Sequence, residues 1–135
     1  MVDDDENYPK LLTEAFRSAK IPGKFTWLED GESAWAHLEE KIKGSAFNEL
    51  PNLILLDINM PGMNGFEFLR LVRKNENLQA LPVVMLSVSE SPHDVRHSYF
   101  MGANAYITKP TDFDQMEGMF RAIYQFWFQY AKILR

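Results

Sequence analysis

The 135-residue sequence contains no cysteine, no long hydrophobic run and no surplus of positive charge. The absence of cysteine excludes disulfides, thiol catalysis and Cys-ligated zinc or iron–sulfur sites. The longest uninterrupted apolar run is only about four residues, far below the roughly 20 that a membrane helix needs. The 14 Lys and Arg against 19 Asp and Glu give a net charge of −5. That balance argues against broad binding to nucleic acid or anionic membranes, because both need a surplus of cations.

Composition and chain start indicate one folded domain. Hydrophobic residues make up 46% of the sequence and aromatic residues 13%, so a chain of this length can bury a core. The first six residues, Met-Val-Asp-Asp-Asp-Glu, have neither the basic nor the apolar part of a signal peptide. We therefore expect a soluble, cytoplasmic protein whose single domain spans residues 1–135, with no output domain.

Helical and strand-like patterns alternate along the chain. Apolar residues at helical spacing predict helices, and short runs that are apolar throughout predict strands buried on both faces, as in a parallel sheet. This alternation predicts an α/β fold with a doubly wound parallel sheet. Helices are expected over residues 8–19, 31–42, 66–74, 92–101 and 112–130, and strands over residues 25–28, 53–56, 83–86 and 105–108.

Polar side chains follow the predicted strands at the point where each strand ends. In doubly wound folds, ligands bind at the carboxyl ends of the strands. One crevice is therefore expected to collect these side chains, which are Asp3, Asp4 and Asp5 at the chain start, then Asp57, Ser87 and Lys109.

The chemistry of this set points to phosphoryl transfer. Clustered carboxylates repel one another and need a cation, and oxygen ligands suit Mg²⁺. The metal and the Lys109 ammonium would neutralise phosphoryl oxygens while a carboxylate acts as nucleophile, and Ser87 would hydrogen-bond one oxygen. Taken singly, each residue has a commoner interpretation, such as a solvated acidic start, a turn cap or a surface lysine. Their joint position at strand ends favours the functional interpretation.

Four segments resemble the motifs of response-regulator receiver (CheY-like) domains of two-component signalling, in order and across essentially the whole chain. Leu-Leu-Asp-Ile-Asn-Met-Pro-Gly-Met-Asn-Gly at residues 55–65 resembles the phosphoacceptor motif. Residues 2–5 resemble the end of the first strand with its acidic pair. Residues 82–87 and 102–110 resemble the fourth strand with its Ser/Thr and the fifth strand with its aromatic switch and Lys-Pro.

The resemblance implies a role for each acidic residue. Asp57 would accept a phosphoryl group from a histidine kinase or a phosphotransfer protein. Mg²⁺ would be held by Asp4, Asp57 and the backbone carbonyl of Asn59, with Asp3 contributing through a water molecule.

The resemblance also implies how the signal would leave the site. Ser87 and Lys109 would hold the phosphoryl oxygens, and Tyr106 would swing inward as Ser87 moves toward the phosphate. The Lys109–Pro110 peptide bond would be cis, a state that proline makes accessible.

The family fold is a five-stranded parallel sheet of order 2-1-3-4-5, and the chain departs from it at the first strand. Only Met1 and Val2 precede the acidic residues, whereas strands usually have about five residues. We therefore predict that this strand is stunted or is supplied by another segment.

A subgroup is also indicated. The long segment 43–52 and the aromatic stretch 124–130 resemble stand-alone regulators that serve bacterial phytochromes and related kinases. Their dimers often use the face made by the predicted helix 92–101, the strand 105–108 and the last helix, which suggests a homodimer here.

Two other functions remain open at this point. A Mg²⁺-dependent phosphohydrolase with Asp57 as nucleophile would commonly carry a second Asp two residues later, where this chain has Asn59. A degenerate receiver that acts by binding alone is disfavoured because every key residue type is present. His93 and His97 lie four apart on a predicted helix, but no third metal ligand is evident. We therefore expect a phosphoacceptor signalling protein rather than an enzyme.

Overall fold

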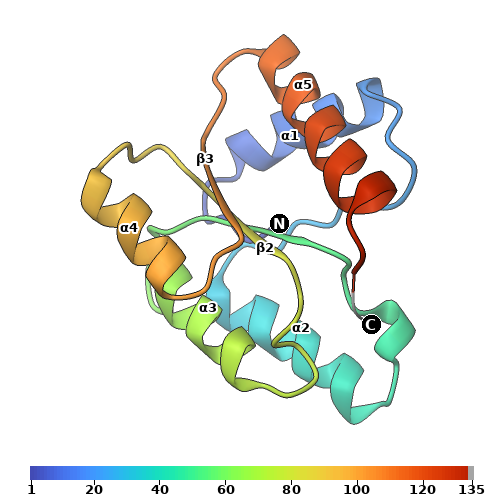
Figure 1. Ribbon diagram of the computed structural model, residues 1–135, viewed down its shortest axis with the longest axis vertical. Helices are drawn as coiled ribbons and strands as arrows, with labels where there is room; N and C mark the ends of the chain where they lie inside the picture. The colour runs from blue at the N-terminus through green and yellow to red at the C-terminus, as the bar shows by residue number, and fades with distance from the viewer. Residues whose placement is uncertain (134–135) are drawn as a thin grey trace.

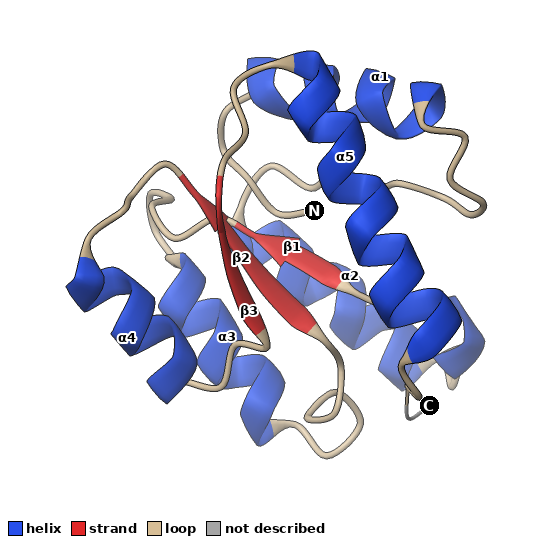
Figure 2. Ribbon diagram, turned by 45° about the horizontal axis from the view of Figure 1, so that its top comes forward, coloured by secondary structure: helices blue, strands red, loops and turns tan. Residues whose placement is uncertain are grey.

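The computed structural model describes residues 1–133, in which helices and parallel strands alternate (Figures 1 and 2). The strands lie between a layer formed by α1 and α5 and a layer formed by α2 and α3, while α4 packs next to β3. From β1 onward the alternation predicted from the sequence is confirmed, but α2 follows α1 without a strand between them among the described residues. The helices are α1 (Asn7–Ser18), α2 (Gly31–Lys43), α3 (Gly65–Lys74), α4 (Pro92–Phe100) and α5 (Phe113–Ile123), with a 3₁₀ turn at Phe47–Glu49 and a π-helical segment at Tyr124–Tyr130; the strands are β1 (Ile54–Leu56), β2 (Val83–Ser87) and β3 (Ala105–Thr108).

Within residues 1–133, the sheet has three strands rather than the five predicted. β2 is central and pairs in parallel with β1 and β3. Beyond β1, Val2 forms isolated parallel bridges to Leu56 and to Leu28. These bridges put single residues where the first and second strands were expected. The segment 25–28 does not form a strand because a strand needs a neighbour of similar length, and Val2 offers it only one bridged residue. The prediction of a stunted first strand is confirmed.

The chain start is fixed by backbone pairing on both sides. Val2 N–H donates to Leu55 O at 2.9 Å, and Asp57 N–H donates to Val2 O at 3.0 Å. On the other side, Leu28 N–H donates to Met1 O at 2.9 Å, and the Met1 ammonium donates to Thr26 O at 2.7 Å. Burial lowers the pKa of this ammonium to about 5.

Side-chain caps explain where three of the helices begin. The carboxylate of Asp30 accepts from the N–H of Ser33 at 2.6 Å at the start of α2, and Asp112 caps α5 in the same way. At the start of α3, Asn64 and Glu67 form a reciprocal capping box, which satisfies two N–H groups that the helix leaves free. That start lies directly after the Asp57 loop, so the box helps to fix the loop.

The core has two halves, one on each face of the sheet. Because side chains alternate along a strand, Ile54 and Leu56 face the layer of α2 and α3, where Phe68 is fully buried. Leu55 faces the layer of α1 and α5. There, the rings of Phe16, Phe25 and Phe120 pack in a triangle with centroids 5.4–5.5 Å apart.

Arg73, near the C-terminus of α3, ties three segments together. Its guanidinium donates to Gly102 O at 2.9 Å, to Leu81 O at 2.8 Å and to the side-chain oxygen of Asn104 at 2.9 Å. The same Asn104 oxygen accepts from Val83 N–H at 2.8 Å. Gly102 has φ of +103°, and a Cβ there would lie 3.1 Å from Arg73 Nε. Glycine therefore serves both the left-handed backbone and the close approach of the arginine. The α4–β3 loop is thereby fastened to α3.

The last helix is shorter than predicted, and Tyr99 of α4 is only half-buried. Tyr99 is 49% exposed, and its hydroxyl accepts from Tyr106 N–H at 3.1 Å at the edge of the sheet. The final helix was expected to run to residue 130, but the α-helix ends at Ile123 and widens into the π-helical segment. Phe126 and Tyr130 in this segment are exposed. Among residues 1–133, no helix is both long and apolar enough to cross a bilayer.

Candidate functional site

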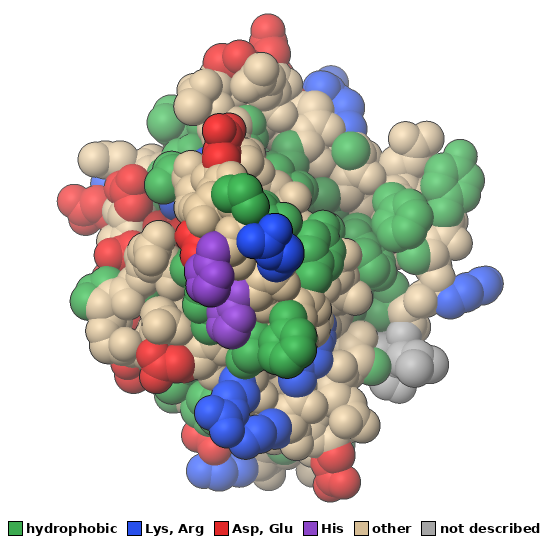
Figure 3. Space-filling view, turned by 60° about the vertical axis from the view of Figure 1, so that its left-hand side comes forward, with side chains coloured by type: hydrophobic (Ala, Val, Ile, Leu, Met, Phe, Trp, Pro, Cys, Tyr) green, Lys and Arg blue, Asp and Glu red, His purple; other side chains and the backbone are tan. Residues whose placement is uncertain are grey.

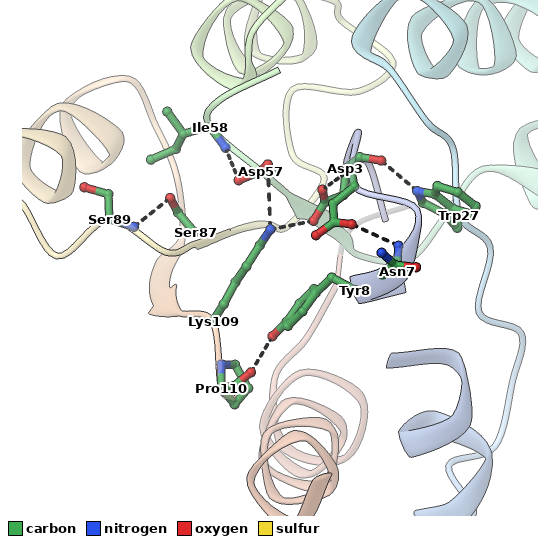
Figure 4. A network of polar contacts seen from close by, with 11 residues as sticks. Asp3, Asn7, Tyr8, Trp27, Asp57, Ile58, Ser87, Ser89, Lys109 and Pro110 are labelled. Atoms are coloured by element: carbon green, nitrogen blue, oxygen red, sulfur yellow. Dashed lines mark hydrogen bonds and ion pairs between the residues drawn. The ribbon is translucent and has the colours of Figure 1, made fainter. Parts of the chain in front are cut away.

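Four of the polar residues predicted from the strand ends meet at the carboxyl edge of the sheet, as Figure 4 shows for Asp3, Asp57, Ser87 and Lys109. Asp3 follows the Val2 bridge, Asp57 follows β1, Ser87 ends β2 and Lys109 follows β3. The parallel strands bring these residues together because their carboxyl ends lie at one edge. Asp3, Asp57 and Ser87 are buried, so the edge forms a site and not a set of solvated groups.

Lys109 is the cation of the site. Its Nζ lies 2.7 Å from Asp3 Oδ2 and 3.7 Å from Asp57 Oδ2, and only 8% of its side chain is exposed. The ammonium also lies 4.7 Å from the ring centre of Tyr8, a cation–π contact that favours the charge. Tyr8 is held in turn by its hydroxyl, which donates to Pro110 O at 2.8 Å. Lys109 is thereby positioned between the two carboxylates.

The surroundings of Asp57 disfavour the charged form of its carboxyl group. Burial, together with the charges of Asp3 and Asp4, raises its pKa to about 6, although Lys109 and the hydrogen bond from Ile58 N–H act in the opposite direction. Three carboxylates and one ammonium carry a formal charge of −2, which is the charge that one divalent cation would neutralise. The site therefore has an excess of negative charge beside a buried nucleophile.

The three carboxylates form an acidic cluster suited to a hard divalent cation. One oxygen from each of Asp3, Asp4 and Asp57 lies within 4.8 Å of the other two. Oxygen donors from carboxylates are the ligands that Mg²⁺ takes in proteins, usually with waters completing the octahedron. The residues present thus fit the predicted metal. Asp4 is exposed while Asp3 is buried against Lys109, and the ligand roles of both residues stay predictions. The Asn59 carbonyl stays a prediction.

A chain of hydrogen bonds leads from the site toward α4. Ser89 N–H donates to the Ser87 hydroxyl oxygen at 3.2 Å, and the Tyr106 hydroxyl donates to Ser89 O at 2.8 Å. The Ser89 hydroxyl donates to Asp94 in the first turn of α4 at 2.6 Å. Ser87, the predicted phosphate contact, is therefore linked to Tyr106, the predicted switch residue, through a single residue.

Sequence reasoning missed three residues that hold the site. Tyr8 contacts Lys109, Trp27 donates from its ring nitrogen to Asp3 O at 2.7 Å, and Asp94 binds Ser89. Trp27 and Tyr8 contact residues 24 and 102 positions away, and no local pattern signals such pairs. An Asp in the first turn of the helix that Pro92 begins was the only available signal for Asp94.

The predicted cis Lys109–Pro110 bond is wrong, since no peptide bond within residues 1–133 is cis. The prediction came only from the resemblance. Trans is the lower-energy state even before proline, by about 0.5–1 kcal/mol.

We expect Asp57→Asn to raise the free energy of unfolding by about 2 kcal/mol at pH 7 without divalent cation. The native carboxyl has a pKa of about 6 against an ordinary value of 3.8, so its charge destabilises the fold at neutral pH. As pH falls from 6 toward 4, the native state binds the proton first and wild-type stability recovers. The advantage of Asn should therefore shrink over that window, as urea unfolding at pH 7 and pH 4.5 would measure. The exposed Asp114→Asn is the control, and an advantage that does not change with pH would contradict the explanation.

The response regulator receiver domain family matches residues 1–121. Response regulator Rcp1 of Synechocystis sp. is 34% identical over 130 residues, which cover 96% of this chain and 87% of Rcp1. The crystal structure of its Mn(2+)-bound form has a TM-score of 0.81 and 32% identity, over 99% of this chain and 96% of that one.

Two further crystal structures are similar over nearly the same length. Response regulator RPA3017, in red light signaling of R. palustris, has a TM-score of 0.87 at 31% identity, covering 99% of this chain and 96% of that one. The phosphorylated cyanobacterial phytochrome response regulator RcpA has a TM-score of 0.85 at 33% identity, covering 99% and 95%. The similar proteins thus include one with a bound divalent cation and one that is phosphorylated.

Proposed function

The chain belongs to the response regulator receiver domain family, and from that premise we propose that Asp57 accepts a phosphoryl group from a histidine kinase or a phosphotransfer protein. Members of this family are phosphoacceptor signalling proteins of two-component systems rather than enzymes. The observation that carries the proposal is the buried Asp57 carboxylate at the end of β1, with Lys109 3.7 Å away and two further carboxylates beside it.

Each residue of the site has a part in the proposed transfer. Asp57 supplies the nucleophilic oxygen, and its Oδ2 lies 3.7 Å from Lys109 Nζ while its Oδ1 accepts from Ile58 N–H. Lys109 and the Ser87 hydroxyl would hold phosphoryl oxygens. Asp4, Asp57 and the Asn59 carbonyl would hold Mg²⁺, with Asp3 acting through water. When bound, the cation supplies positive charge that offsets the phosphoryl oxygens.

The proposed output is a change in protein contacts on the face made by α4, β3 and α5. Phosphorylation adds about −1.5 to −2 charges at one point. A new hydrogen bond from the phosphoryl group to Ser87 would change the contacts of Ser89 and Tyr106, which reach α4. Figure 3 shows histidine, basic and hydrophobic side chains gathered on one face of the molecule. On α4, His93 stacks on His97 and Phe100 is 86% exposed. We propose this face for a second copy or a downstream protein.

The named similar structures suggest the kind of kinase. Several come from phytochrome or bacteriophytochrome pathways by name, so a phytochrome-like histidine kinase in the cytoplasm is the proposed donor. The long loop after α2 and the exposed aromatic residues after α5 were the sequence features that suggested the same subgroup.

The test is intact mass measurement after incubation with Mg²⁺ and acetyl phosphate. We expect an adduct of one phosphoryl group on the wild type, none on Asp57→Ala and an unchanged adduct on the exposed Asp114→Ala. The adduct should also disappear when Mg²⁺ is chelated. An adduct that persists in Asp57→Ala would contradict the assignment, absence of any adduct would favour a degenerate receiver, and multiple turnover of unrelated phosphoesters would favour the hydrolase.

A further inference from the structure

The proposed cation ligands lie on two stretches of chain, each at or just beyond the last residue that the sheet pairs. Val2 is paired at the chain start, and Asp3 and Asp4 follow it. Asp57 N–H donates to Val2 O, and Asn59 follows Asp57 after one residue. Because Mg²⁺ requires a near-octahedral arrangement of oxygen ligands, the relative placing of the two stretches decides how well they share one cation. Residues that fix both stretches beyond the sheet therefore act on cation binding without contacting the cation.

Trp27 supports the first stretch. Its ring nitrogen donates to Asp3 O at 2.7 Å, as Figure 4 shows. The N–H of the same aspartate donates to Leu28 O at 3.2 Å. Residues 27–28 thus hold Asp3 by both its N–H and its carbonyl, which fixes the direction in which the chain continues to Asp4.

Glu32, in the first turn of α2, supports the second stretch. Its carboxylate accepts from the N–H of Met63, 31 residues along the chain, in the turn that leads from Asp57 into α3. Two glycines make room for this contact. A Cβ on Gly31 would lie 2.7 Å from Met63 O, and Gly62 has φ of +72°, with a Cβ there lying 2.6 Å from Glu32 Oε1. The start of α2 and this turn therefore meet closely.

The loop between Asp57 and α3 is closed and anchored, so a shift of its outer turn reaches the site. Gly65 N–H donates to Ile58 O at 2.8 Å and closes the loop. Ile58 and Met60 are buried in the core, while Asn59 between them is exposed. The outer turn, residues 61–63, follows directly, and Glu32 is the α2 side chain that binds its backbone.

We propose that Trp27 and Glu32 are positioning residues for the divalent cation, and that the segment 27–32 holds the two acidic stretches at the separation that the cation needs. This inference rests on the cation role proposed for Asp4, Asp57 and Asn59. Glu32 is exposed and is not one of the three residues of the acidic cluster, so its effect runs through the Met63 turn. Loss of a partner that orients metal ligands typically weakens metal binding about 10- to 100-fold.

The test is the affinity for Mn²⁺ without any phosphodonor, measured from the electron paramagnetic resonance signal of the free ion. We expect Glu32→Ala and Trp27→Phe each to weaken binding about tenfold. Glu32→Gln should stay within about threefold of the wild type, because its amide oxygen still accepts from Met63 N–H. The matched control is Glu40→Ala, which removes the same charge from another exposed position of α2 and should bind as the wild type does.

Amide hydrogen exchange shows where the effect originates. Glu32→Ala should speed exchange at Met63 and leave Val84 of the central strand unchanged. Wild-type affinity in Glu32→Ala or Trp27→Phe would overturn the inference. So would a Glu32→Gln variant as weak as Glu32→Ala, since charge alone would then be responsible, or faster exchange at Val84, since the whole fold would then be weakened.

The acetyl phosphate adduct tests Asp57 as phosphoacceptor separately. Absence of the adduct together with the expected Mn²⁺ affinities would contradict the proposed function and leave the positioning role standing. An adduct that forms while Glu32→Ala and Glu40→Ala bind Mn²⁺ equally would contradict the positioning role alone.

Discussion

Replacing Gly65 by alanine is expected to lower the free energy of unfolding by about 3 kcal/mol and to disable Asp57 as a phosphoacceptor. A Cβ at Gly65 would overlap the backbone oxygen of Asp57 and lie 2.9 Å from the Cα of Ile58. Both atoms belong to the backbone, so no side-chain rotation relieves the clash. The start of α3 would have to move away from the loop that carries Asp57. Urea unfolding measures the first effect, and intact mass after acetyl phosphate treatment measures the second.

Gly118→Ala is the matched control for this substitution. Gly118 lies inside α5, and a Cβ there would meet nothing within 4 Å. Alanine in a helix interior is more favourable than glycine by about 0.5–1 kcal/mol, so this variant should be slightly more stable than the wild type and keep its adduct. Equal stability of the Gly65 and Gly118 variants would show that the close packing of α3 on the Asp57 loop is unimportant.

Replacing Lys109 by methionine is expected to destabilise the protein by about 3–5 kcal/mol at pH 7 without divalent cation. Lys109 is the partner of Asp3, whose side chain is fully buried, at 2.7 Å. Methionine keeps much of the volume but leaves Asp3 and Asp57 with no compensating charge. Below about pH 6 the loss should become smaller, because the pKa of Asp57 is about 6 even with the lysine present and its carboxyl can then be neutralised by a proton. Urea unfolding between pH 5 and pH 8 measures both effects.

Two comparisons isolate the electrostatic part of the Lys109 effect. Lys10→Met removes an exposed lysine from α1 and should change stability by less than about 0.5 kcal/mol. Adding Mg²⁺ should recover part of the stability of Lys109→Met, because the cation supplies positive charge to the same carboxylates. If Mg²⁺ and pH leave the deficit unchanged, the loss comes from packing around Tyr8 and not from unpaired charge.

The fold was predictable where local pattern and tertiary structure agree. Leu55 and Val84 lie in runs that are apolar throughout, a pattern that indicates strands covered on both faces of a sheet. Asp30 and Asp112 cap helices through hydrogen bonds within their own turn. The prediction was wrong where structure depends on a distant partner. Residues 25–28 have strand-like composition, but a strand there needs a neighbouring segment to pair with. That neighbour is at Val2, so residues 25–28 alone do not show whether the pairing can extend.

The candidate site follows the same division. Asp57, Ser87 and Lys109 were found because a general rule places ligands at the carboxyl ends of parallel strands. Tyr8 and Trp27 were not found, because a tyrosine and a tryptophan near apolar neighbours are read as core residues. Their polar atoms act on the site only through packing that the fold creates.

Arg73 fastens one end of α4, and the Ser89 hydroxyl holds the other end by donating to Asp94 and accepting from Ser91 N–H. The C-terminal end adjoins Gly102, which Arg73 binds, whereas the first turn is held through Asp94 and Ser89. A nine-residue helix is about 13 Å long, so it can act as a rigid arm that pivots where it is fastened. Travel then grows with distance from the pivot, and His93 would move farther than Phe100. Under the proposed switch, a protein bound at Phe100 would stay attached in both states, while one bound at His93 would distinguish them.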